Sequence, residues 1–276
     1  MTNFLERYGS WGLVAGAGEG LGKAYSVALA QRGMHVILVD KNEASIRQLG
    51  EEIKQTFQQE VQLLVQDLAQ HNSAERLMEA IQKVDCRLVV FNAAYGPVKA
   101  FLHNTHEELD LYLDLNSRTP IHLLHRFTKY LIDQQTSGGA ILMSSLAGLF
   151  GTQLVTPYSA TKAFDFNLAE GLHYELKPHN IDILACCAGA MDTPNYQSTE
   201  PQYGRLKPNV MAPSDVAGPA LQQLGRRPLF IPGFSNRLTY FLFTRIFSRK
   251  MATWLLNRTM GKMYQAKKLP QINQNR

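Results

Sequence analysis

Short, almost uninterrupted apolar runs alternate along the chain with longer stretches in which apolar positions recur at helical spacing. The apolar runs are rich in Val, Ile and Leu, which is typical of strands that are buried on both faces. They lie at residues 11–17, 35–40, 61–67, 87–94, 139–145, 181–189 and 228–233. The helical stretches lie at residues 20–33, 42–59, 71–84, 106–135, 156–178 and 213–225. This alternation predicts an α/β doubly wound fold, a mostly seven-stranded parallel sheet with helices on both faces.

The same pattern predicts how the chain is divided. Residues 1–233 are expected to form a single domain, and residues 234–276 a helical tail. Within the domain, the stretch 191–212 contains three prolines and no periodic pattern. Loops of this length are typical of lids and binding segments.

Composition narrows the class of protein. Hydrophobic residues make up 45% and charged residues 18% of the chain, which is ordinary for a soluble globular protein. The three cysteines do not form a disulfide framework, because their number is odd and Cys186 and Cys187 are neighbours in an apolar run. The N-terminus lacks a secretory pattern, and no apolar run approaches about 18 residues. We therefore expect a cytoplasmic protein.

Charge is distributed unevenly along the chain. Asp215 is the last acidic residue, and the 61 residues after it carry 11 Lys or Arg, so this part is +11 and residues 1–215 are −6. In the tail, one amphipathic helix is expected from Leu238, Phe241, Leu242, Arg245, Ile246, Arg249 and Lys250.

Three roles of the tail stay open. It closes a pocket or an oligomer interface, it makes peripheral contact with an anionic membrane, or it attracts an anionic carrier such as coenzyme A or acyl carrier protein. Nucleic acid is not expected as a partner, because no recognised binding module accompanies the charge.

A glycine-rich segment, "AGAGEGLG", follows the first strand. Its glycines are Gly16, Gly18, Gly20 and Gly22. A strand that turns sharply into a helix, with little side chain in the way, lets the backbone approach a pyrophosphate at the helix N-terminus. The segment departs from the strict G-x-G-x-x-G pattern but meets the same physical demand, and it predicts dinucleotide binding.

Charged residues near this turn bear on the choice of cofactor. Asp40 ends the second strand, where a carboxylate can accept hydrogen bonds from ribose hydroxyls and would repel a 2′-phosphate. Glu19 adds a negative charge, and Lys41 works in the opposite direction. We expect NAD, with NADP as the alternative. A strand-end Asp that simply starts a turn is the other interpretation of Asp40.

The segment "PYSATKAF" places Tyr158 and Lys162 four residues apart, on one face of a predicted helix. The spacing alone decides little, because it recurs at Tyr203/Lys207 and Tyr264/Lys268. Only the first pair has a serine 13 residues upstream, Ser145, which ends a predicted strand.

In order and spacing, these features resemble the short-chain dehydrogenase/reductase family over roughly residues 10–195. The resemblance implies a Rossmann-type fold and four catalytic residues, Asn116, Ser145, Tyr158 and Lys162. It implies that the cofactor is bound by Gly16, Gly18, Glu19, Gly20, Leu21, Gly22, Asp40, Lys41, Asp67, Leu68, Asn92, Ala93, Ala94, Tyr158, Lys162, Gly189, Met191 and Thr193. The sequence departs from the family pattern at Ala15, Ala94 and Ala188, where the family usually has Thr, Gly and Pro.

The resemblance also implies a mechanism. Tyrosine is a poor proton exchanger at neutral pH, but an ammonium one turn away stabilises the phenolate, so Lys162 would make Tyr158 a usable acid/base. Ser145 would hydrogen-bond the substrate oxygen, Lys162 would also bind the nicotinamide ribose, and Asn116 would hold a water behind Lys162. The expected activity is the NAD(P)(H)-dependent interconversion of a secondary alcohol and a ketone.

The expected substrate is hydrophobic, for example a steroid or a 3-oxoacyl thioester, and the expected assembly is a homodimer or homotetramer. No metal is expected, because neither the His103/His106 pair nor the His122/His125 pair has further ligands to complete a site. Two rival functions remain. One is a non-catalytic dinucleotide-sensing protein, which would be expected to lose Tyr158 or Lys162, and the other is a membrane-docked scaffold, which depends on the tail alone.

Overall fold

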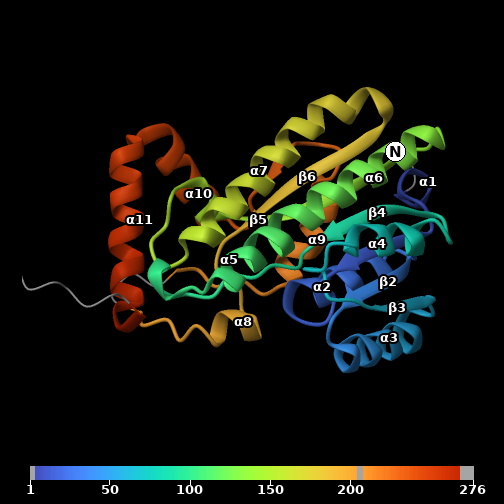
Figure 1. Cartoon of the computed structure of the whole chain (residues 1–276). Coiled ribbons are helices and arrows are strands. Elements are labelled where there is room, and N and C mark those ends of the chain that lie inside the picture. Colours follow the sequence, from blue (N-terminus) through green and yellow to red (C-terminus); the bar gives the residue numbers. More distant parts are fainter. Residues whose placement is uncertain (1–3, 204–207, 268–276) are drawn as a thin grey trace, which may run out of the picture.

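The computed structural model describes residues 4–203 and 208–267. Its centre is a seven-stranded sheet in the order β3-β2-β1-β4-β5-β6-β7, in which every adjacent pair is parallel (Figure 1). The strands are β1 (Trp11–Ala15), β2 (His35–Asp40), β3 (Val61–Val65), β4 (Cys86–Phe91), β5 (Gly138–Ser145), β6 (Ile181–Ala188) and β7 (Leu229–Phe230). The predicted doubly wound, parallel sheet is confirmed.

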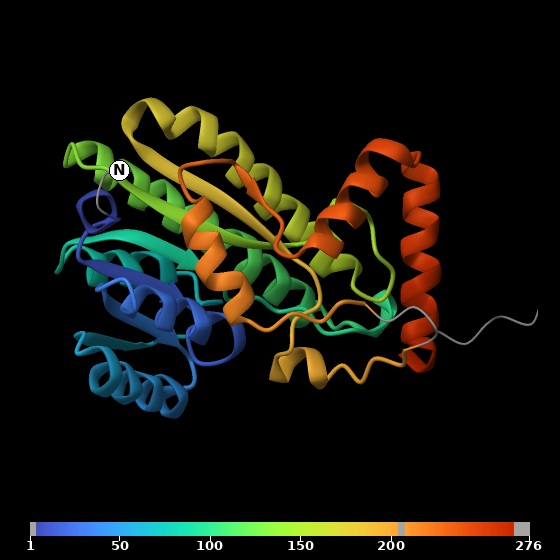
Figure 2. The same ribbon diagram turned by 180° about the vertical axis from the view of Figure 1, so that it is seen from behind.

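Helices cover both faces of the sheet. Apolar side chains of α1 (Phe4–Tyr8), α2 (Gly20–Ala30), α3 (Glu43–Phe57) and α9 (Ser214–Gln223) form one core cluster with the strands. Those of α4 (Ser73–Ile81), α6 (Thr119–Asp133) and α7 (Thr156–Leu176) form the other. Figure 1 shows α4 and α6 in front of the sheet, and Figure 2 shows α9 (orange) in front of the opposite face. The continuous apolar strands are explained by this burial from both sides.

The helix predicted over 106–135 is interrupted. It consists of α5 (His106–Leu113), a π-helical segment at Asp114–Arg118, and α6. Asn116 lies inside the π segment and is buried. Such single-turn irregularities are frequent at functional sites, and here the interruption turns a polar side chain inward.

The tail is also broken. Helix α10 (Phe234–Phe241) continues into a π-helical segment at Leu242–Ile246, and α11 (Arg249–Met263) follows. The expectation of one amphipathic helix through Lys250 is wrong, because Phe247 is extended (φ −83°, ψ 142°) and Ser248 caps α11 by accepting a hydrogen bond from the Met251 amide. Residues 268–276 lie outside the described residues.

The tail helices contact loops at the carboxyl edge of the sheet. The Asn257 side chain donates to the Gly151 carbonyl at 2.9 Å, and the Phe243 ring packs 6.0 Å from the Phe150 ring. Figure 1 shows α11 set apart from the sheet at one end of the molecule. Within the described residues, none of the helices has the length and apolar character that crossing a membrane requires.

The stretch predicted as a long loop over 191–212 contains the short helix α8 (Pro194–Gln197). Met191 and Met211 form a parallel bridge that joins the two ends of the stretch. Residues 204–207 lie outside the described residues, and with them Lys207 of the second Tyr/Lys pair.

Candidate active site

Tyr158 and Lys162 lie in the first turns of α7, which begins at Thr156 just beyond the carboxyl edge of the sheet. The Lys162 Nζ atom lies 5.8 Å from the centre of the Tyr158 ring. Lys162 is 3% exposed, whereas Tyr158 is half-buried. In the described residues the Tyr158 hydroxyl has no hydrogen-bond partner. The arrangement places a buried ammonium beside a half-buried phenol.

The Lys162 ammonium is held by two acceptors. It donates to the Met143 carbonyl at 2.7 Å and to Asp165 Oδ2 at 2.9 Å. Desolvation acts to lower the pKa of Lys162, but the Asp165 carboxylate, together with the Tyr158 phenol and the Cys187 thiol, more than offsets it, so the pKa is raised above its ordinary value. The side chain is therefore a buried cation over the physiological range.

Ser145 is the last residue of β5, as predicted. Its Oγ atom accepts a hydrogen bond from the Ala147 amide at 3.2 Å and so caps a short 3-10 turn at Leu146–Leu149. No described residue accepts from its O–H group, which leaves the hydroxyl free to donate. The 3-10 turn packs against α7, so Ser145 and Tyr158 belong to adjoining segments.

Asn116 braces the loop after β4. Its Oδ1 atom accepts from the Tyr95 amide at 2.8 Å, and its Nδ2 group donates to the Tyr95 carbonyl at 2.8 Å and to Thr161 Oγ1 at 3.0 Å. The side chain thus connects this loop to α7, one residue before Lys162. The structure shows a bracing role directly, whereas the water relay stays a prediction.

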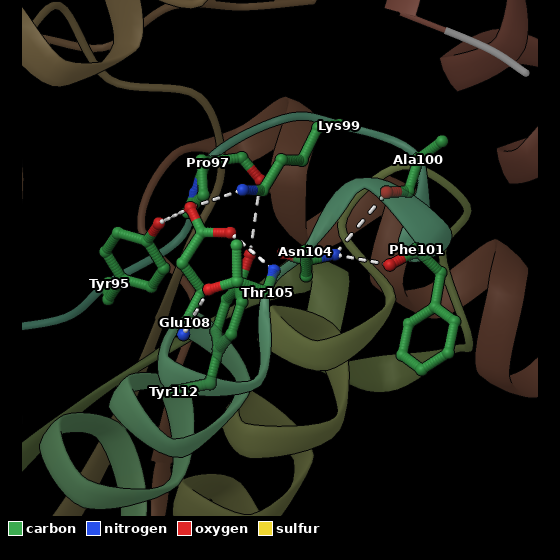
Figure 3. A network of polar contacts seen from close by, with 9 residues as sticks. All are labelled: Tyr95, Pro97, Lys99, Ala100, Phe101, Asn104, Thr105, Glu108 and Tyr112. Atoms are coloured by element: carbon green, nitrogen blue, oxygen red, sulfur yellow. Dashed lines mark hydrogen bonds and ion pairs between the residues drawn. The ribbon is translucent and has the colours of Figure 1, made fainter.

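A network of polar contacts fixes the same loop farther along (Figure 3). Glu108, from α5, accepts hydrogen bonds from the Tyr95 hydroxyl at 2.8 Å and from the Lys99 ammonium. It also completes a capping box with Thr105 at the start of α5. Contact with Lys99, the Thr105 amide and Tyr95 lowers the pKa of Glu108 to about 2, so it is ionised at any working pH. The network holds the segment that carries Gly96.

Gly96 itself lies against the Tyr158 ring. A Cβ atom at Gly96 would lie 2.5 Å from Tyr158 Cδ2, closer than any side chain tolerates. The glycine therefore allows the loop to pack on the ring and fix its orientation. Gly96 was not among the predicted site residues, although a glycine soon after a strand end was a usable signal.

The glycine-rich turn has the shape that a dinucleotide requires. A Cβ atom at Gly22 would lie 1.8 Å from the Gly16 carbonyl oxygen, so only glycine fits there. Gly16 has φ +80°, a left-handed conformation that glycine adopts readily. Helix α2 begins at Gly20, and Glu19, its N-cap residue, makes no side-chain cap. The first amides of α2 are thus open to a phosphate.

Asp40 faces this turn. Its Oδ2 atom accepts from the Gly18 amide at 2.9 Å and its Oδ1 atom from the Asn42 amide at 3.0 Å. The carboxylate is therefore fixed beside the turn, and Lys41, next to Asp40, and Glu19, next to Gly18, are both exposed. The hydrogen bond from the Asn42 amide fits the interpretation in which Asp40 starts a turn, and the ribose contact stays a prediction.

The ends of β4 and β6 meet the turn from two sides. The Asn92 side chain donates to the Gly16 carbonyl at 2.9 Å, and Ala93 lies against Gly16. Thr193, after β6, approaches Gly20, where a Cβ atom would lie 2.9 Å from its Cγ2 atom. Residues that are far apart in sequence are thus brought to one edge of the sheet.

The remaining predicted cofactor residues differ in how far they are buried. Leu21 and Leu68 are buried, Asp67 and Ala94 are exposed, and Met191 is half-buried. Asp67 is engaged locally, since its Oδ1 atom accepts from the Ala69 amide at 3.0 Å.

Two further residues near the site, Asn236 and Asp165, were not predicted. Asn236, from α10, is buried against Gly189, where a Cβ atom would lie 2.8 Å from Asn236 Oδ1. Asp165 forms the buried ion pair with Lys162. Its position three residues after Lys162 was visible in the sequence, but nothing there showed that it was buried. Neither His pair gains ligands, since no group of three metal-binding side chains occurs in the described part of the chain.

The parallel sheet, the glycine turn and the Ser145, Tyr158 and Lys162 group together define an oxidoreductase of the dinucleotide-binding α/β class. A family model described as short chain dehydrogenase matches residues 11–204. The chain therefore belongs to the short-chain dehydrogenase family, and it is a dehydrogenase that acts on CH–OH groups.

Individual relatives agree with this assignment. A 7beta-hydroxysteroid dehydrogenase from Clostridium sardiniense is 32% identical over 235 residues, which cover 85% of this chain and 90% of the relative. A very-long-chain 3-oxoacyl-CoA reductase from Anas platyrhynchos is 26% identical over 220 residues, 78% of this chain and 70% of the relative. A solved structure of a 7beta-hydroxysteroid dehydrogenase has a TM-score of 0.84 at 24% identity and covers 92% of this chain and 99% of its own.

Proposed function

We propose that the protein interconverts a secondary alcohol and a ketone on a hydrophobic, steroid-like substrate, with a nicotinamide dinucleotide as the hydride carrier. The observation that carries this proposal is the half-buried Tyr158 phenol beside the buried Lys162 ammonium, at the edge of the sheet where the glycine turn lies. Both residues that a non-catalytic dinucleotide sensor would be expected to lack are present, which favours the enzyme over that rival.

Each protein group has a distinct task in the proposed reaction. In the oxidative direction Tyr158 would remove the hydroxyl proton of the substrate, and in the reductive direction it would return a proton to the substrate oxygen. The dinucleotide supplies the hydride chemistry, and the protein supplies position and charge. Ser145 donates its free O–H to the substrate oxygen, Lys162 stabilises the phenolate, and Asn116 holds the loop and a water behind Lys162.

The cofactor is NAD(P), and we propose NAD over NADP. The cradle at Gly16 and Gly22, with the open N-terminus of α2, suits a pyrophosphate. Asp40 is fixed beside it by two backbone amides and would repel a 2′-phosphate.

Titration of wild-type protein with NADH and NADPH, followed by cofactor fluorescence, tests this preference. Wild type should bind NADH more tightly than NADPH. Asp40→Ala should reduce the ratio of these two affinities by roughly tenfold to a hundredfold, because that factor corresponds to the loss of one hydrogen bond to a charged group. Lys41→Ala is the matched control, and it should keep or increase the preference for NADH. A wild-type preference for NADPH would reverse the assignment.

A steroid is the substrate class that we favour over an acyl thioester. The 32% identical relative is a 7beta-hydroxysteroid dehydrogenase, whereas the 3-oxoacyl-CoA reductase relative is 26% identical. Phe150, which follows the Ser145 segment, is buried and packs against Phe243 of the tail, so aromatic side chains lie close to the candidate site. Absorbance assays at the reduced-nicotinamide band across steroid, acyl-thioester and simple secondary-alcohol panels decide between these classes.

For the tail we propose peripheral contact with an anionic membrane. Helix α10 exposes Phe234, Leu238 and Phe241 on the face opposite the buried Asn236. On α11, Met251 and Trp254 are exposed, and the Arg258 guanidinium stacks 5.1 Å from the Trp254 ring. Residues 234–267 carry seven Lys or Arg and no acidic residue. Exposed aromatic and apolar side chains among cations fit an anionic lipid surface, and a second copy of the same cationic face would be repelled.

Co-sedimentation with phosphatidylglycerol and with phosphatidylcholine vesicles tests the contact. Wild type should pellet only with the anionic vesicles. The double variant Arg258→Glu/Lys262→Glu should bind at least about thirtyfold more weakly, because each cation near such a surface contributes about 1 kcal/mol.

The matched control is Arg226→Glu/Arg227→Glu, which changes the net charge equally on the exposed segment before β7. Equal losses in both double variants would show that only net charge matters. Binding of coenzyme A in place of vesicles would favour the carrier alternative. A tail variant that lowers the molar mass in light scattering would instead assign this face to the homodimer or homotetramer, which stays a prediction.

A further inference from the structure

Asp165 is a buried acid that no step of the proposed mechanism uses. It lies on α7 three residues after Lys162, and it is 3% exposed. Its Oδ2 atom accepts from the Lys162 ammonium at 2.9 Å. Counted for the side chains alone, Lys162 and Asp165 are each 4% exposed. An ionic pair at this depth requires a specific reason, because both charges are removed from water.

The second carboxylate oxygen of Asp165 adds to the free-energy cost of burying the pair. Oδ1 of Asp165 is buried and has no hydrogen-bond partner among the described residues. Desolvation raises the pKa of Asp165 above its ordinary range, although Lys162 acts in the opposite direction. A side chain chosen only for packing would avoid this cost, so its charge toward Lys162 is the feature that explains it.

The other groups around the ammonium do not replace Asp165. From β5, Met143 offers a neutral carbonyl, and the Ser144 hydroxyl donates to the Lys162 carbonyl at 2.6 Å. From β6, burial raises the pKa of the Cys187 thiol to about 12, so this group is neutral near pH 7. From α7 itself, the Tyr158 phenol acts on the ammonium, whereas the Glu170 carboxylate acts on the Cys187 thiol. Of the described residues, only Asp165 places a carboxylate in contact with the ammonium.

The position of the ammonium is fixed as well as its charge. An ammonium has three N–H donors, and two of them are used by Met143 and Asp165. With the nitrogen held at these two points, its charge stays 5.8 Å from the centre of the Tyr158 ring, and one donor remains for a ligand.

We propose that Asp165 is a positioning residue that keeps the Lys162 side chain protonated and directed toward Tyr158 and the bound dinucleotide. The inference rests on the proposed roles of Tyr158 and Lys162. Without the carboxylate, the largest interaction that opposes desolvation of the amine is lost, so Lys162 loses its proton at a lower pH and stabilises the phenolate less.

The test is the pH profile of Asp165→Asn, which preserves shape and removes charge. The alkaline limb of kcat should move to lower pH by at least one unit, and kcat should fall about tenfold on that side of the profile, because a shift of one pKa unit corresponds to a tenfold change in protonation. The Kd for NADH, measured by fluorescence, should rise over the same pH interval. Asp165→Glu restores the charge and should recover the wild-type limb even where kcat is reduced.

Two results would overturn the proposal. One is an Asp165→Asn enzyme with a lower melting temperature but an unmoved pH profile, which would assign Asp165 a purely structural role. The other applies where Asp165→Asn does not fold. It is an Asp165→Glu enzyme whose alkaline limb of kcat moves to lower pH although the carboxylate charge is retained. Lys162→Ala and Tyr158→Phe, assayed in parallel, separate this failure from a failure of the proposed active site, which would leave those two variants active.

Discussion

Replacement of Tyr158 by Phe is expected to lower kcat by about a thousandfold, within the range that general acid–base catalysis contributes. NAD(H) affinity should stay close to that of wild type. The substitution removes only the hydroxyl, because the ring that packs against Gly96 is retained. Absorbance at the reduced-nicotinamide band measures turnover, and cofactor fluorescence measures binding.

Tyr174→Phe is the matched control. It removes one hydroxyl from the same helix at a side chain that is 65% exposed, and it should leave kcat unchanged. A Tyr158→Phe enzyme with kcat within about tenfold of wild type would reject tyrosine as the acid/base. Loss of NADH binding together with turnover would instead assign Tyr158 to the cofactor site alone.

The sheet and the carboxyl-edge residues were predictable because they depend on local pattern. Each strand is an apolar run, and a parallel sheet with helical crossovers brings the ends of such runs to one edge. That reasoning is sufficient to bring Asn92, Ser145 and the glycine turn to the same side of the molecule. It does not require knowledge of any individual contact.

Contacts between distant segments were not predictable in the same way. Asn236 meets Gly189 only because α10 folds back over the end of β6. The π segment around Asn116 depends on the Tyr95 backbone, which lies 21 residues earlier in the chain. The break in the tail was not predicted, because the helical spacing of apolar residues continues past Phe247. The backbone nevertheless leaves the helical conformation at that residue. Periodicity reports which side of an element is apolar, and it contains no information about such tertiary partners.

Gly22→Ala is expected to raise the Kd for NADH by about a hundredfold or more. The added methyl group would lie 1.8 Å from the Gly16 carbonyl oxygen, 2.8 Å from the Gly16 carbonyl carbon and 2.9 Å from Asn92 Nδ2. Two of these neighbours are backbone atoms, so the turn must move to make room. Overpacking of this kind costs about 1–3 kcal/mol in stability alone, and here the displaced backbone is the surface that faces the pyrophosphate.

Gly171→Ala provides the matched control for this substitution. Gly171 is exposed in the C-terminal half of α7, and a Cβ atom there would meet nothing within 4 Å. It should bind NADH as wild type does and unfold at a slightly higher temperature, because alanine is favoured over glycine in a helix by about 1 kcal/mol. Thermal unfolding with and without NADH gives an independent measure, since a ligand that binds the native state raises its melting temperature. Wild type and Gly171→Ala should both show that rise. A Gly22→Ala protein that shows it in full would mean that the dinucleotide lies elsewhere than on the turn after β1.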